Sequence, residues 1–190
     1  MRFVFCAAAI SHILDDWSGL DADSAVGYIL SSISYEGGIA QGPNMEAHGG
    51  STYCAIATLS LLGRMDALSR KQKRKLVRWC CQRLDEGFTG RPNKPSDTCY
   101  SFWVGATLKL LSMDQSAEDV EVLIERSANF VLDTQDSVVG GLAKWVDNST
   151  DPLHTQLGLG GLSLFGYPGL SPLNPALNVT FKSMEKAHKK

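Results

Sequence analysis

Residues 102–111 read FWVGATLKLL, an apolar stretch that returns elsewhere in the chain. Similar stretches are YCAIATLSLLG at 53–63 and QLGLGGLSLFG at 156–166, and a weaker copy, FCAAAISHIL, stands at 5–14. The copies lie about fifty residues apart. Self-similarity at a fixed period is typical of an array of supersecondary units, so the repeat decides the fold.

Each apolar copy is paired with an amphipathic segment. Ser69 is a suitable N-cap for a helix that we predict to about Leu84. Its inward face would carry Leu76, Val77, Cys80 and Leu84. Its cations lie mostly on the other face. Such a basic face is more often simply solvated than a binding patch. A similar helix is predicted over 117–132, with an inward face of Val120, Leu123, Ile124 and Val131.

Gly-rich loops precede the apolar copies, at 36–38, 86–88 and 140–142. A helix that is apolar nearly all round has to be covered on both sides, so the pairs should stack into an inner and an outer layer. We therefore predict an all-α fold, an α/α toroid of helix-pair repeats that remains an incomplete barrel in this chain. The repeat domain should occupy 1–166, and the proline-containing segment 167–190 should be irregular.

Composition excludes several classes of protein. The net charge is −2, which gives no general attraction to nucleic acid, and no long uncharged apolar run predicts a transmembrane segment. The apolar start is followed at once by polar residues, which disfavours a signal peptide. Five cysteines, mostly inside apolar helical patterns, indicate reduced thiols in a cytoplasmic protein. They are Cys6, Cys54, Cys80, Cys81 and Cys99.

The densest polar cluster is GRPNKPSDTCYSFW at 90–103, a loop that enters an apolar helix. Asp97 and Cys99 lie at the helix start, where an anion or thiolate is stabilised. Carboxylate oxygen and thiolate sulfur both suit zinc, although Asp-x-Cys alone is weak evidence.

The repeat supplies a third candidate ligand. The junction DPLHT at 151–155 corresponds to the one before Cys99, and His154 falls one place from that cysteine. Equivalent junctions of a closed array meet on one rim, so His154 is expected to face Asp97 and Cys99. Three protein ligands leave a fourth zinc position open, as in catalytic sites. The plainer interpretation of His154 is a capping or loop histidine.

Cations would lie beside this metal. His48 aligns with Asp97 in the repeat and should reach the same rim, near Arg91 and Lys94. Such a group suits a polyanionic leaving group, for example a diphosphate, unless the two loop cations are simply solvated.

Three aromatic residues start the same apolar helix. They either line an apolar cavity or belong to the ordinary core, which is the commoner outcome. They are Tyr100, Phe102 and Trp103.

These motifs together resemble the β subunits of protein prenyltransferases. The stretches 46–50 (EAHGG), 90–103 and 151–154 (DPLH) occur in the order and at the separations of that family. Within the family the phrases at 143–145 (AKW) and 175–179 (PALNV) are most similar to type I geranylgeranyltransferases, and the match is to the C-terminal half of the subunit. The resemblance implies transfer of a geranylgeranyl group from its diphosphate to the cysteine of a C-terminal CaaX box, through a zinc-bound thiolate.

The resemblance also implies residue roles. Asp97, Cys99 and His154 would be the ligands of one zinc ion and, with Tyr100, the catalytic residues. Substrate-binding roles would fall to His48, Arg91, Lys94, Tyr100, Trp103, Lys144 and Leu153.

Two of these positions distinguish members of the family. Lys144 stands where farnesyltransferases carry a magnesium-binding aspartate, so Mg²⁺ should not be required. Leu153 replaces a tyrosine typical of farnesyltransferases.

The implied partners are a prenyltransferase α subunit and CaaX proteins such as Rho-type small GTPases. The alternatives are the Rab-type geranylgeranyltransferase or farnesyltransferase β subunit and, in another class, an inactive truncated subunit that only binds the α subunit. A terpenoid cyclase is disfavoured because its Asp-rich motif is missing from the sequence. We further expect that this chain cannot close the ring alone and that activity needs the other half.

Overall fold

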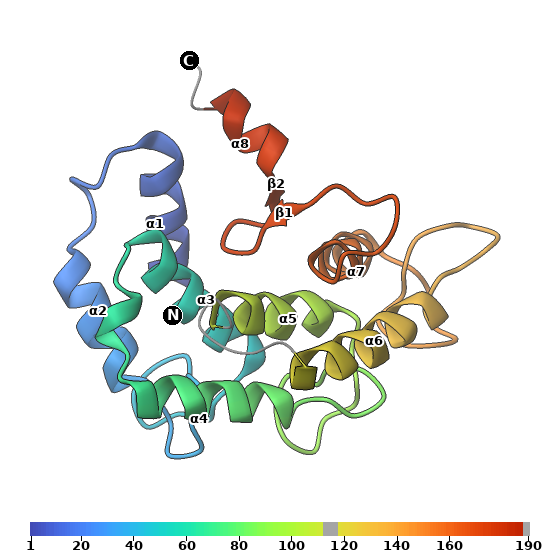
Figure 1. Cartoon of the computed structure of the whole chain (residues 1–190), viewed down its shortest axis with the longest axis horizontal. Helices are drawn as coiled ribbons and strands as arrows, with labels where there is room; N and C mark the ends of the chain where they lie inside the picture. The colour runs from blue at the N-terminus through green and yellow to red at the C-terminus, as the bar shows by residue number, and fades with distance from the viewer. Residues whose placement is uncertain (112–117, 188–190) are drawn as a thin grey trace.

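The computed structural model describes residues 1–111 and 118–187. Helices make up nearly all of its regular structure (Figure 1). The helices are α1 (Arg2–Leu14), α2 (Ala22–Ser31), α3 (Gly49–Leu61), α4 (Arg70–Cys81), α5 (Cys99–Leu111), α6 (Glu118–Asp133), α7 (Pro152–Leu164) and α8 (Phe181–Ala187). A 3-10 turn, η1, spans Met65–Ala67, and two short strands, β1 (Leu173–Asn174) and β2 (Val179–Thr180), form an antiparallel hairpin.

The helices form two layers, as the repeat predicts. Helices α1, α3, α5 and α7 pack side by side in that order, and they contain the four apolar copies. Helices α2, α4 and α6 lie along the outside of this row (Figure 1). The predicted all-α architecture of helix pairs is therefore confirmed.

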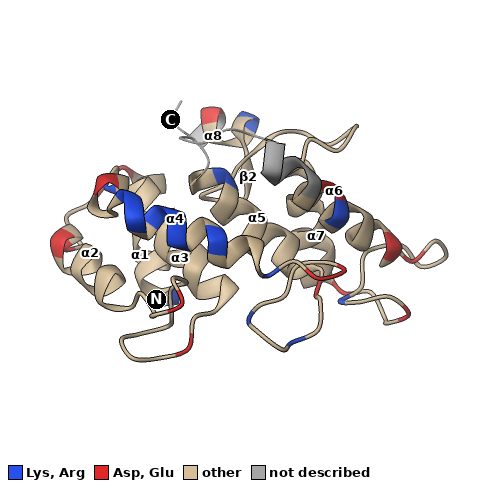
Figure 2. Ribbon diagram, turned by 60° about the horizontal axis from the view of Figure 1, so that its bottom comes forward, with Lys and Arg blue, Asp and Glu red and all other residues tan. Residues whose placement is uncertain are grey.

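The two layers differ in burial because they differ in sequence pattern. In α3 every residue from Gly49 to Leu59 is buried, since partners cover the helix on all sides. In α4 only Leu76, Trp79 and Cys80 are buried, and the cations form a stripe on the outer surface (Figure 2).

The outer helix α4 begins where the sequence predicts. Ser69 and Gln72 form a capping box, in which each side chain bonds the other residue's backbone. Its end at Cys81 comes one turn earlier than predicted. The predicted inward residues of α6 are partly confirmed, because Val131 is buried and Leu123 and Ile124 are half-buried, whereas the side chain of Val120 lies outside the described residues.

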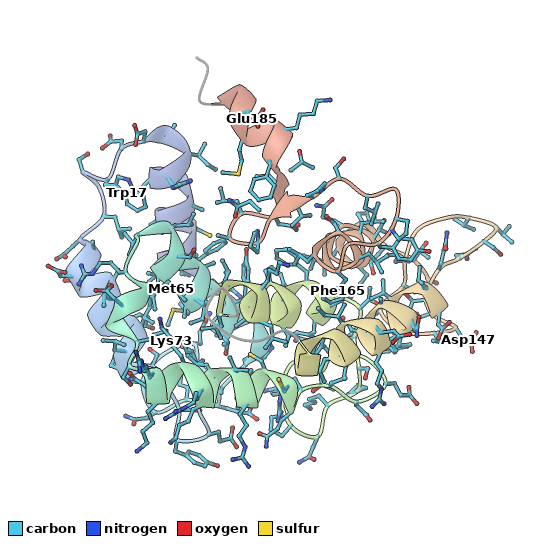
Figure 3. All side chains as sticks on the ribbon, viewed as in Figure 1. Trp17, Met65, Lys73, Asp147, Phe165 and Glu185 are labelled. Carbon is cyan, nitrogen blue, oxygen red and sulfur yellow. The ribbon has the colours of Figure 1, made fainter. Side chains whose placement is uncertain are left out.

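Glycines let the inner helices approach one another. A Cβ on Gly161 of α7 would lie 2.3 Å from Ser101 Oγ and 2.9 Å from the backbone of Ser101 on α5. Phe165, at the end of α7, lies beside α5, where a Cβ on Gly105 would come within 2.9 Å of its ring (Figure 3). Alanine at Gly161 would force α5 and α7 apart.

We expect Gly161→Ala and Gly27→Ala to change stability in opposite directions. The extra methyl at 161 overpacks the α5–α7 contact and should lower the free energy of unfolding by about 1–3 kcal/mol. At the exposed Gly27 of α2 nothing lies within 4 Å of the added carbon, so alanine should stabilise by about 0.5–1 kcal/mol. Urea unfolding of both variants measures this, and equal shifts would contradict the packing argument.

The C-terminal segment has more regular structure than predicted. The sequence indicates an irregular tail from 167, yet the structure contains the β1–β2 hairpin and α8 there. Asn174 Oδ1 accepts the Ala176 N–H and Asn178 adopts a positive φ of 54°, which together form the turn. The hairpin sits on the inner helices, because Tyr53 Oη donates to the Ala176 carbonyl at 3.0 Å. The domain boundary at 166 stays a prediction.

A membrane-spanning segment is not found in the described part of the chain. Among residues 1–111 and 118–187, none of the helices combines the length and the hydropathy needed to cross a bilayer.

Candidate metal centre and its flanking anion site

A polar side chain accepts a backbone N–H at the start of three inner helices. His48 caps α3 by accepting the Gly50 N–H on Nδ1 at 3.0 Å. Asp97 accepts the Cys99 N–H at the start of α5 at 2.9 Å, and Asp151 accepts the His154 N–H at the start of α7 at 3.0 Å. Polar side chains at equivalent junctions therefore point at the exposed ends of adjacent parallel helices, and this brings them together in space.

Asp97, Cys99 and His154 meet as predicted. One ligand atom from each, a carboxylate oxygen, Sγ and an imidazole nitrogen, lies within 4.8 Å of the others, and all three residues are buried. Nε2 of His154 is 3.3 Å from Oδ1 of Asp97. Side chains that each bond a metal at about 2.0–2.3 Å need this kind of separation.

Asp151 orients His154. Its Oδ2 is hydrogen bonded to His154 Nδ1, while Oδ1 holds the backbone N–H of the same residue. These hydrogen bonds lower the pKa of the Asp151 carboxyl, so it remains a carboxylate and favours the tautomer with the proton on Nδ1. The lone pair of Nε2 is then directed toward Asp97 and Cys99, the arrangement usual for metal-binding histidines.

The donor set fits zinc. Nitrogen, sulfur and oxygen donors in one buried cluster match its preferences, and three ligands leave one position for substrate. Burial, and then the neighbouring Asp97 carboxylate, raise the pKa of the Cys99 thiol. A thiolate at this position therefore calls for a cation close to the sulfur, and a bound divalent metal provides it.

A second polar group flanks the cluster. Tyr100 Oη lies 3.0 Å from Nε2 of His48. Burial, and then the positive charge of Arg91, lower the pKa of His48, so the ring is neutral. Because Nδ1 already accepts from Gly50, the proton must be on Nε2, which donates to Tyr100. Burial raises the pKa of Tyr100 to about 12, so its hydroxyl keeps a proton that is free to be donated outward.

Gly90 forms a cradle for Tyr100. A Cβ at Gly90 would lie 2.3 Å from both Oη and Cζ of the ring, so only glycine leaves room for it. The Gly90 carbonyl also accepts the Gly49 N–H at 2.7 Å, which joins the 90–103 loop to the start of α3.

The other charged residues predicted for the site lie around the cluster and are more exposed. Arg91 is half-exposed and pairs with Glu46 at 3.0 Å. Lys144 Nζ lies 3.7 Å from Asp97 Oδ2 and 4.6 Å from the centre of the Trp145 ring. Lys94 is exposed on the loop and has no ion pair among the described residues. It is therefore not brought to the cluster by a contact of its own.

Trp103 and Leu153 differ in how deeply they are buried. Trp103 is half-buried and packs on Tyr53, with ring centroids 5.0 Å apart, whereas Phe102 and Tyr53 are fully in the core. Leu153 is exposed beside His154. For Phe102 the plainer core interpretation is the one that the structure supports.

Some residues of the site were not predicted from sequence. From sequence alone, Asp151 is assigned to a helix junction and is given no role of its own. An aspartate just before a proline at a helix start is nevertheless a recognisable N-cap signal. Glu46 and Gly90 gave no such signal, since their roles depend on Arg91 and Tyr100 lying beside them.

Comparison with known proteins agrees with this fold. Residues 1–179 match the prenyltransferase alpha-alpha toroid domain. The fold and the repeated junctions, together with this match, show that the chain belongs to the prenyltransferase α-α toroid family.

Its relatives narrow the class. The chain is 45% identical to the geranylgeranyl transferase type-1 subunit beta of Arabidopsis thaliana, over 94% of this chain and 49% of the relative. It is 42% identical to the same subunit of Dictyostelium discoideum, over 98% of this chain and 51% of the relative. A solved Candida albicans protein geranylgeranyltransferase-I complexed with GGPP superposes with a TM-score of 0.87 at 28% identity, over all of this chain and 56% of that one. The chain thus spans about half the length of these relatives.

Proposed function

We propose that this chain forms the catalytic part of a type I protein geranylgeranyltransferase β subunit. The observation that carries the proposal is the meeting of Asp97, Cys99 and His154 at one rim of the helix array. The similarity to type-1 β subunits supports the substrate class, geranylgeranyl diphosphate and a C-terminal CaaX cysteine. Its partners would be an α subunit and CaaX proteins such as Rho-type small GTPases, in the cytoplasm.

The three ligands would hold one zinc ion. Such an ion supplies an open coordination position and lowers the pKa of the substrate cysteine. Asp151 keeps the His154 ring in the tautomer that presents Nε2. Lys144 lies on the other side of Asp97 and partly balances its charge.

The flanking group would stabilise the leaving diphosphate. Neutral His48 donates to Tyr100, so the Tyr100 hydroxyl proton is available to a phosphate oxygen. Arg91 adds positive charge on the same rim, and Lys94 follows on the loop. Donors that are fixed before the reaction stabilise the charge as it develops in the transition state. Trp103, half-buried beside this group, would flank the isoprenoid.

The test is a transfer assay with the complete β subunit that carries this sequence, purified with an α subunit. We expect transfer of geranylgeranyl to a peptide ending in Cys-aliphatic-aliphatic-Leu, and weaker transfer of farnesyl. Arg91→Ala should lower the rate by about 10–100-fold without loss of bound zinc.

Other outcomes select the alternatives. A preference for farnesyl diphosphate would favour a farnesyltransferase, and transfer only to Rab proteins would favour the Rab-type enzyme. If the chain binds the α subunit stably but transfers nothing to any substrate, the remaining alternative is an inactive subunit that only binds the α subunit.

Lys144 predicts turnover without magnesium. Its ammonium group lies close to Asp97 and over the Trp145 ring, on the rim where the diphosphate would bind. A fixed cation neutralises developing charge without a second metal. We expect full activity in magnesium-free buffer, and Lys144→Asp should lower it on the order of 10–100-fold unless magnesium is restored.

The control for this comparison is Lys144→Gln, which removes the charge without creating a ligand. Its rate should fall and should not respond to magnesium. A wild-type enzyme that stops when magnesium alone is withdrawn would contradict the role of Lys144.

A further inference from the structure

A cationic pocket lies on the outer layer, away from the candidate metal centre. It has a volume of about 290 Å³ and opens beside α4. Its lining residues are Glu36, Lys75, Arg78, Trp79, Gln82 and Arg83. We call it the α4 pocket.

The charges of the α4 pocket are unbalanced. Lys75, Arg78 and Arg83 are positive and Glu36 is the single acidic residue in the lining, so the net formal charge is +2. None of the three cations forms an ion pair with any residue in the described ranges. A phosphate group carries a charge of about −1.5 to −2 at neutral pH, which matches this imbalance, whereas a carboxylate supplies only −1.

Arg83 is unusual because it is 8% exposed. Its Nε donates to the Trp79 carbonyl at a long 3.4 Å, and its guanidinium lies 4.9 Å from the centre of the Trp79 ring. A nearly buried guanidinium has five N–H donors and ordinarily has an anion or several carbonyls around it. Here the pocket is the open side, where an anion would complete its hydrogen bonding.

Trp79 also lines the pocket. Its side chain is 1% exposed, and its indole nitrogen has no hydrogen-bond partner among the described residues. The ring packs closely against Gly38, where a Cβ would lie 2.5 Å from Cε2. Because the ring lies in the pocket lining, its indole N–H signal should respond to a ligand that binds there.

We propose that the α4 pocket binds a phosphate group through Arg83, Arg78 and Lys75, beside the Trp79 ring. Further cations lie along α4 (Figure 2) and would raise the local concentration of anions near the pocket. The phosphate could be free in solution or part of a phosphorylated lipid headgroup, since both present the same oxygens. This site is separate from the site proposed to bind the diphosphate, which is formed by His48, Tyr100 and Arg91.

The readout is the indole N–H signal of Trp79 in a nuclear magnetic resonance spectrum of the isotope-labelled chain. The chain carries Phe3→Lys and Ile10→Lys on the exposed face of α1, which are expected to keep it from aggregating. The chain has four tryptophans, so four indole signals are expected, and Trp79→Phe assigns the relevant one. Inorganic phosphate is added at constant ionic strength. We expect the Trp79 signal to shift and saturate, and Arg78→Gln or Arg83→Gln to weaken the binding about tenfold or more.

Controls separate this site from general charge effects. Arg74→Gln removes an exposed cation from the same helix without touching the pocket, and Arg91→Gln alters only the other site, so neither should change the Trp79 titration. If the chain is purified only in complex with an α subunit, equilibrium dialysis with radiolabelled phosphate makes the same comparison between variants. Arg78 is exposed, so its variant should fold even if Arg83→Gln does not.

Several results would overturn the proposal. A Trp79 signal that ignores phosphate, equal losses in Arg74→Gln and Arg78→Gln, or an equally strong response to acetate would each do so, the last in favour of a carboxylate partner. Vesicles of phosphatidylcholine with phosphatidylinositol bisphosphate, compared with phosphatidylserine vesicles of equal charge, identify the source. If the chain prefers the phosphatidylinositol bisphosphate vesicles and Arg78→Gln abolishes this preference, the ligand is a lipid headgroup. If the chain shows no such preference but the phosphate titration is positive, the ligand is a soluble phosphate.

Discussion

Cys99→Ala and His154→Ala are each expected to reduce bound zinc from one ion per chain to background, and transfer activity with it. The ligand atoms of Asp97, Cys99 and His154 lie within 4.8 Å of one another in a buried cluster, so removal of one leaves two protein ligands. Two ligands are too few for a zinc site in a protein, since catalytic sites use three. Metal analysis after dialysis, together with the transfer assay, measures both losses.

The contact between Asp151 and His154 predicts a partial loss of zinc affinity. Asp151→Asn keeps the N-cap but weakens the interaction with His154 Nδ1, and the cost for such a change in metal affinity is about 10–100-fold. Cys6→Ala is the matched control for Cys99→Ala, because Cys6 is an exposed cysteine on α1 and should leave zinc unchanged. Undiminished zinc in both Cys99→Ala and His154→Ala would disprove the assignment.

The 190-residue chain purified alone is expected to aggregate and to lack transfer activity. Helix α1 belongs to the inner row, and among the described elements α3 is its main packing partner. Its large apolar side chains Phe3 and Leu14 are 88% and 69% exposed, and Ile10 and Ile13 are more than half exposed. Repeat arrays need polar outer faces on their terminal units, and an apolar end promotes association. The chain spans about half the length of its relatives, and we expect the remaining half to supply helix pairs that cover this face.

Surface substitutions test the cause. Phe3→Lys with Ile10→Lys should reduce the aggregation of the isolated chain, because both change the exposed face of α1. Tyr35→Lys is the control, since Tyr35 is 89% exposed but lies on a loop outside that helix. Light scattering of the chain alone and with an α subunit gives the state of association. A monomeric, active isolated chain would contradict this prediction and the need for the other half.

Much of the candidate site follows from the repeat. The alignment of the junctions at 46–50, 90–103 and 151–155 predicts that Asp97, Cys99 and His154 share a rim, because parallel helices in a regular stack start at the same end. The structure places them together. The exact ligand distances and the tautomer of His154 do not follow, since they depend on Asp151 turning toward Nδ1 rather than toward solvent.

Other features have no local signal. The hairpin at 173–180 depends on the Tyr53 hydroxyl reaching the Ala176 carbonyl, a contact between residues 123 apart in sequence. The three prolines after residue 166 indicate only that no helix continues there. Lys94 is exposed on its loop without an ion pair among the described residues, so its place in the diphosphate site stays a prediction.

The sequence by itself determined the layering of this protein. An apolar stretch every fifty residues or so, each paired with an amphipathic one, can be buried only by stacking the pairs, and this requirement is local to each repeat. Only the tertiary structure decided how side chains from different repeats meet. The Trp79 ring packs against Gly38 because that residue has no side chain, and Tyr100 reaches His48 because Gly90 has none. Such contacts depend on distances between helices, which burial patterns along a single helix do not specify.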